Sequence, residues 1–268
     1  MSLKETPFLL RSAWRVWRRD GARHLLHRAA WHLRWRNLGR AFDERGPWVT
    51  GFTIKGIQYG GSYDAAQDLR LALFLEEVSV GGKRLLELGP LEGGHTLALA
   101  RAGGSEILAV EGRPDNLRRC LLIKDVFDLK NATFLLGDIR DVTRPSHGEF
   151  DLVIAMGVLY HLPDPDRLLA HLVDIAPLTL LWTHVADERH PANAKEGTLV
   201  SPWGTFRGKV YIEDTAHPLS AVDREAIWLY RQDLVSLVKA VGFGGCKILA
   251  EWPAGSSPGP SVLAVLSV

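Results

Sequence analysis

The chain has 268 residues, of which 46% are hydrophobic and 24% charged, and its formal net charge at pH 7 is +1. This length and apolar content suffice for one sizeable core plus a small extension, and two cysteines are too few for a disulfide framework or a cysteine metal site. No apolar run reaches the roughly 18 residues of a transmembrane helix, and the N-terminus lacks the apolar region of a signal peptide. We therefore expect a soluble cytoplasmic protein with reduced thiols and no metal centre.

The first 45 residues are strongly basic. Eleven Lys or Arg against four Asp or Glu give this segment +7, while the rest of the chain carries −6. Residues 8–40 have the spacing of two helical segments, broken at Asp20-Gly21, with tryptophans interleaved among the arginines. Three roles are open for this segment: a helical cap on the mouth of a site, peripheral contact with a membrane surface, or RNA binding.

A glycine-rich, partly extended stretch follows at 48–64 and predicts a linker or hairpin. Residues 65–78 then have the periodicity of an amphipathic helix. Its predicted apolar face consists of Leu69, Ala72, Leu73 and Val78.

A strand, a glycine turn and a helix are predicted at 84–88, 89–94 and 96–101. Glycine tolerates positive φ and carries no Cβ, so such a turn lets backbone N–H groups and a helix N-terminus approach a ligand closely. Glu87 places a carboxylate near the end of this strand, where a pyrophosphate would be repelled. A ligand with a cationic group fits this turn better.

The next two strands also end in acids. The strand at 106–110 ends at Glu111, at the distance from the turn where dinucleotide-binding folds place a ribose-binding acid, and the strand at 133–136 leads to Asp138. The remaining elements of this alternating region are helices at 114–127 and 166–174 and strands at 150–155 and 178–182. Ligands bind beyond the carboxyl ends of strands in open α/β sheets, so these acids are expected to share one site.

Residues 185–227 lack sustained periodicity and are rich in Pro, Gly, Trp and His. A segment of this length within a compact domain predicts a functional insertion, such as a substrate lid. A helix at 231–241 follows, and strands at 247–251 and 261–268, joined by a Pro/Gly/Ser-rich turn, predict a closing antiparallel hairpin.

Four motifs in order, ELGPLEGG, AVEGRP, LLGDIRD and FDLVIAMGVLYHLPDP, give residues 60–268 a sequence that resembles the class I S-adenosylmethionine (SAM) dependent methyltransferases. The GVLYH-L-DP stretch is most similar to the branch with the tRNA wobble-uridine (5-oxyacetyl or methoxy uridine) methyltransferases. Pro90 and Glu92 depart from the usual loop. The resemblance implies an α/β, Rossmann-like, seven-stranded sheet of order 3-2-1-4-5-7-6, with an extension at 1–58, a catalytic domain at 59–268 and a lid at 185–227.

The resemblance also implies SAM as cofactor, with S-adenosylhomocysteine (SAH) as product. Glu111 would accept hydrogen bonds from the ribose hydroxyls, Asp138 and Ile139 would hold adenine, Glu87 would act at the amino end, and Tyr59 or Tyr63 would reach the methionine end. The full set of expected cofactor residues is Tyr59, Glu87, Gly89, Pro90, Gly93, Glu111, Gly112, Arg113, Asp138, Ile139, Met156 and Tyr160.

Catalysis is expected to use a histidine. His161 and His184 follow neighbouring strands, and an imidazole suits the deprotonation of a hydroxyl at neutral pH. Trp203, Tyr211 and His217 of the insertion are expected to shape the acceptor pocket. The favoured function is methyl transfer to a hydroxyl, less readily an amine, of a small or medium-sized metabolite. The alternatives are a tRNA wobble-uridine methyltransferase and a SAM-binding protein without transferase activity.

Overall fold

The computed structural model describes residues 37–191, 194–217, 219–220 and 222–268, and the chain divides into two compact units, 1–46 and 47–268. In the first unit the described part contains helix α2 (Leu38–Asp43). The helices predicted at 8–40 lie almost entirely outside the described residues, so their three possible roles stay predictions. The division after residue 46 assigns the whole stretch 48–64 to the larger unit, whereas the sequence suggested a boundary at 58.

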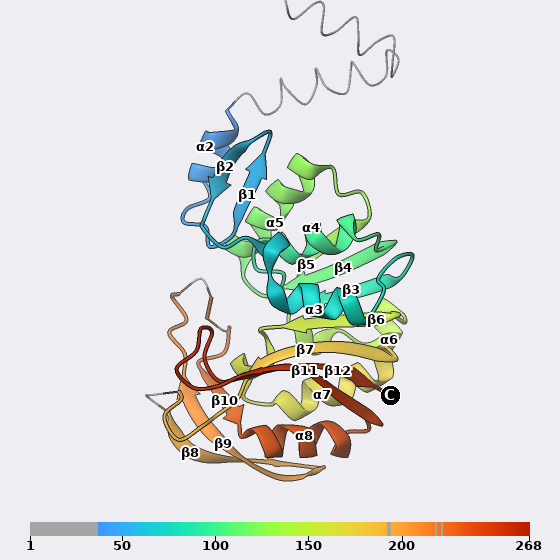
Figure 1. The fold of residues 1–268 in the computed structure, drawn as a ribbon, viewed down its shortest axis with the longest axis vertical. Helices are drawn as coiled ribbons and strands as arrows, with labels where there is room; N and C mark the ends of the chain where they lie inside the picture. Colours follow the sequence, from blue (N-terminus) through green and yellow to red (C-terminus); the bar gives the residue numbers. More distant parts are fainter. Residues whose placement is uncertain (1–36, 192–193, 218, 221) are drawn as a thin grey trace, which may run out of the picture. The chain divides into compact units, whose positions relative to one another are not determined.

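A seven-stranded sheet forms the centre of the larger unit (Figure 1). Its order is β11-β12-β7-β6-β3-β4-β5; the five strands from β7 to β5 are parallel, and β12 is antiparallel to both of its neighbours. This is the predicted order 3-2-1-4-5-7-6, which confirms the Rossmann-like methyltransferase fold. The strands are β3 (Arg84–Leu88), β4 (Glu106–Glu111), β5 (Ala132–Leu136), β6 (Leu152–Met156), β7 (Leu178–His184), β11 (Gly245–Trp252) and β12 (Ser261–Ser267).

Helices flank this sheet, as strands buried on both faces require. All five residues of β6 are buried, α4 packs with α5 beside β4, and α7 packs with α8. No helix within the described ranges has both the length and the apolar content needed to cross a bilayer. The helices and helical turns are α3 (Leu69–Glu77), α4 (Gly94–Arg101), α5 (Pro114–Phe127), α6 (Arg144–His147), α7 (Pro165–Ile175), α8 (Arg231–Ala240), η2 (Ala65–Gln67), η3 (Ile139–Asp141) and η4 (Leu159–His161).

The insertion between β7 and α8 is more regular than its sequence indicates. It contains a three-stranded antiparallel sheet of order β10-β9-β8, formed by β8 (Lys195–Ser201), β9 (Gly204–Ile212) and β10 (Glu225–Leu229). Its apolar side chains join the main hydrophobic core, because Leu199, Phe206 and Ile227 are buried in the same cluster as β6 and α7. The sequence did not indicate these strands, because charged residues and glycines interrupt the alternation of apolar residues in β8 and β9. The role of the insertion as a lid stays a prediction.

The stretch before β3 forms the predicted hairpin, with β1 (Gly51–Ile54) paired to β2 (Ile57–Gly60). The helix predicted at 65–78 is instead broken at Asp68. Asp64 accepts the N–H of Ala66 and begins η2, and Asp68 accepts the N–H of Arg70 and begins α3. Because α3 begins at this second cap, its buried face differs from the predicted one. It buries Leu71 and Phe74 and leaves Leu69 and Ala72 exposed.

Candidate active site

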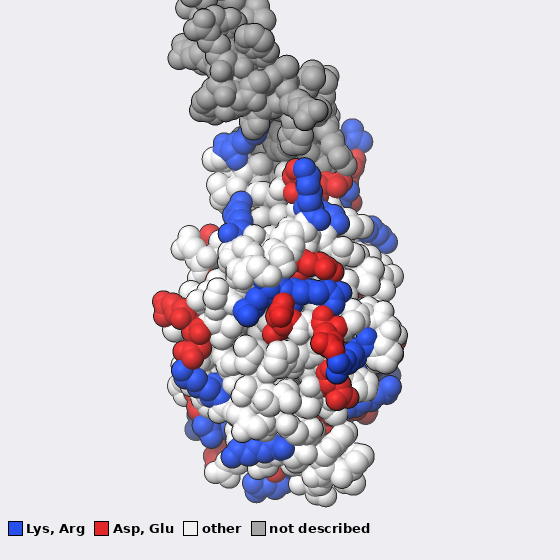
Figure 2. Space-filling view, turned by 90° about the vertical axis from the view of Figure 1, so that its right-hand side faces the viewer, with Lys and Arg blue, Asp and Glu red and all other residues white. Residues whose placement is uncertain are grey.

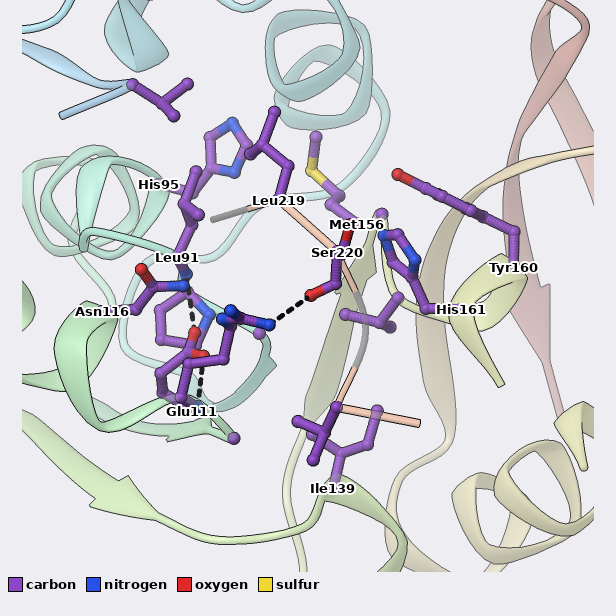
Figure 3. Close-up of a pocket in the computed structure, with 18 of the residues that line it drawn as sticks. Leu91, His95, Glu111, Asn116, Ile139, Met156, Tyr160, His161, Leu219 and Ser220 are labelled. Carbon is purple, nitrogen blue, oxygen red and sulfur yellow. Dashed lines mark hydrogen bonds between the residues drawn. The ribbon is translucent and has the colours of Figure 1, made fainter. Parts of the chain in front are cut away.

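A cavity of about 420 Å³ lies beyond the carboxyl ends of the parallel strands. Figure 3 shows its lining, with Leu91, Glu111 and Asn116 on one side and Met156, Tyr160 and His161 on the other. The structure thus brings together residues that follow four different strands. The predicted site residues that line it are Gly89, Pro90, Glu111, Gly112, Arg113, Asp138, Ile139, Met156, Tyr160 and His161.

Other predicted residues lie elsewhere. Glu87 and Gly93 are next to the cavity without lining it, and Tyr63, rather than Tyr59 of β2, contributes to the wall. None of the three predicted insertion residues lines the cavity: Trp203 lies in the β8–β9 turn with 37% of its surface exposed, Tyr211 lies on β9, and His217 is exposed. The insertion instead contributes Leu219, Ser220, Val222 and Asp223, which its sequence did not single out.

The glycine turn after β3 is shaped by backbone conformations that glycine allows. Gly89 has φ +67°, and a Cβ there would lie 2.6 Å from Cγ1 of Val158; Gly93, the N-cap of α4, has φ +80°. Leu91 also has a positive φ of 56°, and its N–H donates to Glu111 while its carbonyl accepts from the Cys120 thiol. Contacts from β4 and α5 therefore fix the backbone conformation of this turn at the edge of the cavity.

Glu111 is the acid at the tip of β4, and only 5% of its surface is exposed. One carboxylate oxygen accepts the N–H of Leu91 at 3.1 Å and the other accepts the N–H of Arg113 at 2.9 Å. Burial raises the pKa of Glu111 to about 7, although these N–H groups and Asn116 oppose the rise. A buried carboxylate facing a cavity is suited to accept hydrogen bonds from two ligand hydroxyls.

Glu87 and Glu92 are two buried acids beside the glycine turn. Glu87 is buried and accepts a 2.5 Å hydrogen bond from the Thr96 hydroxyl, and burial raises its pKa. Glu92, which the sequence marked only as a departure from the family loop, is fully buried and accepts the N–H groups of Val49 and Thr50. This acid fastens the segment before β1 onto the glycine turn, and that segment lines the cavity.

Asp138 and Ile139 lie at the tip of β5 as predicted, but the Asp138 side chain is already engaged. It caps η3 through the N–H of Arg140 and pairs with the Arg140 guanidinium at 2.6 Å, which lowers the pKa of Asp138. Arg140 also pairs with Asp164 and with Asp223 of the insertion. Ile139 supplies an apolar surface at this end of the cavity.

A polar network occupies the wall formed by the segment before α3. The Asp68 carboxylate binds Arg70 at 2.7 Å, His95 at 2.8 Å and the Tyr63 hydroxyl. The Arg70 guanidinium lies over the Trp182 ring at 4.1 Å, so it connects α3 to the tip of β7. The pKa of Asp68 is lowered by His95, Arg70 and Tyr63 against the opposing effect of burial, which keeps this carboxylate ionised.

The two predicted histidines have different surroundings. His161 lines the cavity, its Nδ1 lies 2.7 Å from Glu213 Oε1, and Tyr160 packs against its ring. His184 does not line the cavity; it stacks on Trp228 at 4.7 Å, and its Nδ1 lies 3.2 Å from the carbonyl oxygen of Pro260. Burial lowers the pKa of His184 to about 4, so its imidazole is neutral at pH 7.

Together these features fit SAM. The glycine turn accepts close backbone approach, Glu111 offers two acceptor oxygens for a ribose diol, Ile139 and Leu91 offer apolar surface for a base, and the Tyr63–Arg70–His95 wall offers polar groups for an amino-acid end. The fold and this cavity define a class I SAM-dependent methyltransferase.

The chain belongs to the methyltransferase domain family, whose model matches residues 62–244. It is similar to the N-terminal domain of EvdMO1, crystallised in the presence of SAH and D-fucose, with 31% identity, a TM-score of 0.73 and coverage of 87% of this chain and 96% of that one. The whole EvdMO1 chain is matched with 29% identity and a TM-score of 0.65; 87% of this chain is covered but only 47% of EvdMO1.

A more distant similarity is to the tRNA U34 carboxymethyltransferase of Dichelobacter nodosus (strain VCS1703A). The identity is 28% over 128 residues, which is 47% of this chain and 39% of that protein. The chain thus spans less than half of both longer relatives, EvdMO1 and the tRNA enzyme. The family membership and the SAM cofactor follow from these findings and from the fold.

Proposed function

We propose that this chain transfers the SAM methyl group to a hydroxyl of a small or medium-sized metabolite, with a deoxysugar as the acceptor class. The observation that carries the proposal is His161, whose imidazole lines the cavity together with Met156, at the carboxyl end of β6. A neutral alcohol must lose a proton as it takes up a methyl group, and an imidazole is suited to accept that proton near pH 7. A neutral amine needs no such base and is the less favoured acceptor.

The sugar class is supported by the similarity to EvdMO1. Its N-terminal domain, which this chain matches over 87% of its own length, was crystallised with D-fucose, a deoxysugar that carries several hydroxyls. In the present cavity, Tyr160 and Trp182 add aromatic surface near His161, on which the apolar face of a sugar ring can pack. Bound SAM supplies an electrophilic methyl group, and the protein's contribution is to orient the acceptor oxygen in line with it and to take up the proton.

A tRNA wobble uridine is the second candidate, supported by the partial similarity to the tRNA U34 enzyme and by the basic segment 1–45. Among the described residues of the face shown in Figure 2, Lys and Arg side chains are interspersed with Asp and Glu. A phosphate backbone is normally bound by a more uniform basic surface, so this face favours a small acceptor.

The test is methyl transfer from radiolabelled SAM to D-fucose and a panel of deoxysugar glycosides, with total tRNA and a set of primary amines in parallel. The expected result is label in a sugar as a methyl ether. Label in tRNA, with none in any sugar, would favour the second candidate, and label confined to the amines would overturn O-methylation.

The role of His161 is tested on the same acceptor. Replacing His161 by Gln is expected to lower turnover by ~10²–10⁴ and to leave SAM affinity nearly unchanged, because the base is lost while the cofactor contacts remain. His147→Gln is the matched control, since His147 lies in α6 outside the cavity. Full turnover by His161→Gln would exclude base catalysis by this residue.

A further inference from the structure

We infer that Glu213 is the positioning residue that makes His161 a proton acceptor, an inference that rests on the function proposed above. Glu213 follows β9 in the insertion, 52 residues from His161 along the chain. Its Oε1 lies 2.7 Å from His161 Nδ1, and the two side chains are only 4% and 17% exposed. The insertion therefore contributes to the chemistry of the cavity and not only to its walls.

The contact decides which imidazole nitrogen carries the proton. An ionised carboxylate can only accept hydrogen bonds, so Nδ1 of a neutral His161 must hold the proton and donate it to Glu213. Nε2 is then left with its lone pair, and it is the nitrogen available to an acceptor hydroxyl. As the acceptor oxygen forms its bond to the methyl carbon, its proton passes to Nε2, and the S–C bond breaks with its electron pair left on sulfur. Glu213 stabilises the imidazolium that results.

The backbone around Glu213 holds it in this position. Its N–H donates to the Arg224 carbonyl at 2.8 Å, which closes the loop between β9 and β10. The N–H of Ile227 on β10 donates to the carbonyl of Leu162, directly after His161, at 3.0 Å. The strands that carry Glu213 are thus hydrogen-bonded to the segment that carries His161, so the pair is set by backbone register and is preorganised.

The buried position of the Glu213 carboxylate also supports the inference. Removing a charged carboxylate from water is unfavourable unless a hydrogen-bonded partner compensates it, and the Nδ1–H group of His161 is that partner for Glu213. Among the described residues, Tyr160, His184 and Arg70 are titratable or charged groups near the pair, and His190 acts on His184 from farther along the insertion. Burial raises the pKa of Tyr160 and lowers that of His184, so both are neutral at pH 7, and Arg70 is paired with Asp68. Glu213 is the group among these that can stabilise an imidazolium.

The experiment is a pH titration of the His161 imidazole by ¹⁵N NMR in the SAH-bound full chain, without any acceptor. The wild type is expected to carry its proton on Nδ1 when neutral. In Glu213→Gln the protonation midpoint of His161 is expected to fall by about one pH unit or more, because a neighbouring opposite charge is removed. Glu213→Asp keeps the charge and is expected to return the midpoint toward the wild-type value.

Asp187→Asn is the matched control, since Asp187 pairs with His190 in the same insertion at 3.4 Å and neither residue lines the cavity. It is expected to leave the His161 titration unchanged. Binding of SAH by calorimetry confirms that each variant is folded. An unchanged midpoint in Glu213→Gln, or a neutral wild-type His161 with its proton on Nε2, would overturn the inference. A lowered midpoint combined with full sugar methylation by His161→Gln would instead overturn the proposed function.

Discussion

Glu111 is predicted to lower the stability of the ligand-free protein while it increases SAM affinity, and Glu111→Gln separates these effects. The folded pKa of about 7 lies above the ordinary 4.5, so the unfolded chain releases this proton more readily. The carboxyl therefore costs little stability below pH 4.5, and the cost grows as pH rises and is complete above pH 7. A difference of this size corresponds to about 3 kcal/mol, of which about 2.5 kcal/mol arises between pH 5 and pH 8.

The assay is urea unfolding of the wild type and Glu111→Gln at pH 5 and pH 8, without SAM. Relative to the wild type, the variant is expected to gain about 2.5 kcal/mol between the two pH values. In Glu111→Gln, one of the N–H groups of Leu91 and Arg113 loses its carboxylate acceptor, and this loss of stability is the same at both pH values. It therefore cancels when the two pH values are compared. Glu106→Gln, at the exposed opposite end of β4, is the matched control and should show a much smaller pH dependence.

Glu111→Gln should weaken SAM binding, although it stabilises the ligand-free protein at high pH. Loss of the charged acceptor for the ribose hydroxyls is expected to weaken binding by about 1.5–3 kcal/mol, which is roughly 10- to 150-fold in Kd. In the wild type, affinity is expected to rise with pH through about 7, because the hydroxyls bind the ionised carboxylate. Calorimetry at pH 6 and pH 8 measures both effects. A pH-independent stability difference together with unchanged SAM affinity would refute the account of Glu111.

Three further predictions follow from single contacts. Glu92→Ala should reduce the free energy of unfolding by about 3–5 kcal/mol in urea, because the buried Arg119 guanidinium, 3.7 Å from the Glu92 carboxylate, loses this partner and buried N–H groups lose their acceptor. Glu92→Gln should be less affected, and equal stability of Glu92→Ala and wild type would contradict this. Gly89→Ala should weaken SAM binding in calorimetry, since its φ of +67° and the 2.6 Å approach to Val158 force the turn to move; unaltered affinity would mean that the turn tolerates a side chain. Because burial lowers the pKa of His184 to about 4, the unfolded chain binds a proton at this side chain at a higher pH than the folded protein does. The free energy of unfolding should therefore fall by up to about 3 kcal/mol as pH drops from 7 to 4. His184→Phe should flatten this fall in pH-dependent thermal unfolding, and an identical profile would exclude His184 as its source.

The elements that carry the glycine turn and the acids could be predicted from the sequence because their signals are local. Helix α5 begins at Pro114 and ends before Asp128 in a left-handed conformation, both of which are short-range backbone preferences. The strand order followed from the resemblance carried by four motifs, and ten of the predicted site residues line the cavity because each lies at the carboxyl end of a parallel strand or within five residues after it. Periodicity and turn chemistry thus predict the strands and turns around the cavity, whereas the assignment of its residues to the cofactor comes from the resemblance and stays a prediction.

The surroundings of His161 depend on tertiary structure rather than on local sequence. Glu213 reaches His161 from 52 residues away, and Glu92 holds Thr50 across 42 residues, through strand register and packing that no local pattern encodes. The insertion sheet was missed because each of its strands buries only part of its surface, and this burial exists only once the strands pack on the core of β6 and α7. Local sequence indicates the strands and helices whose periodicity and end signals are strong. A buried hydrogen-bonded pair such as His161–Glu213, in contrast, exists only where packing brings two distant segments together and excludes water from both.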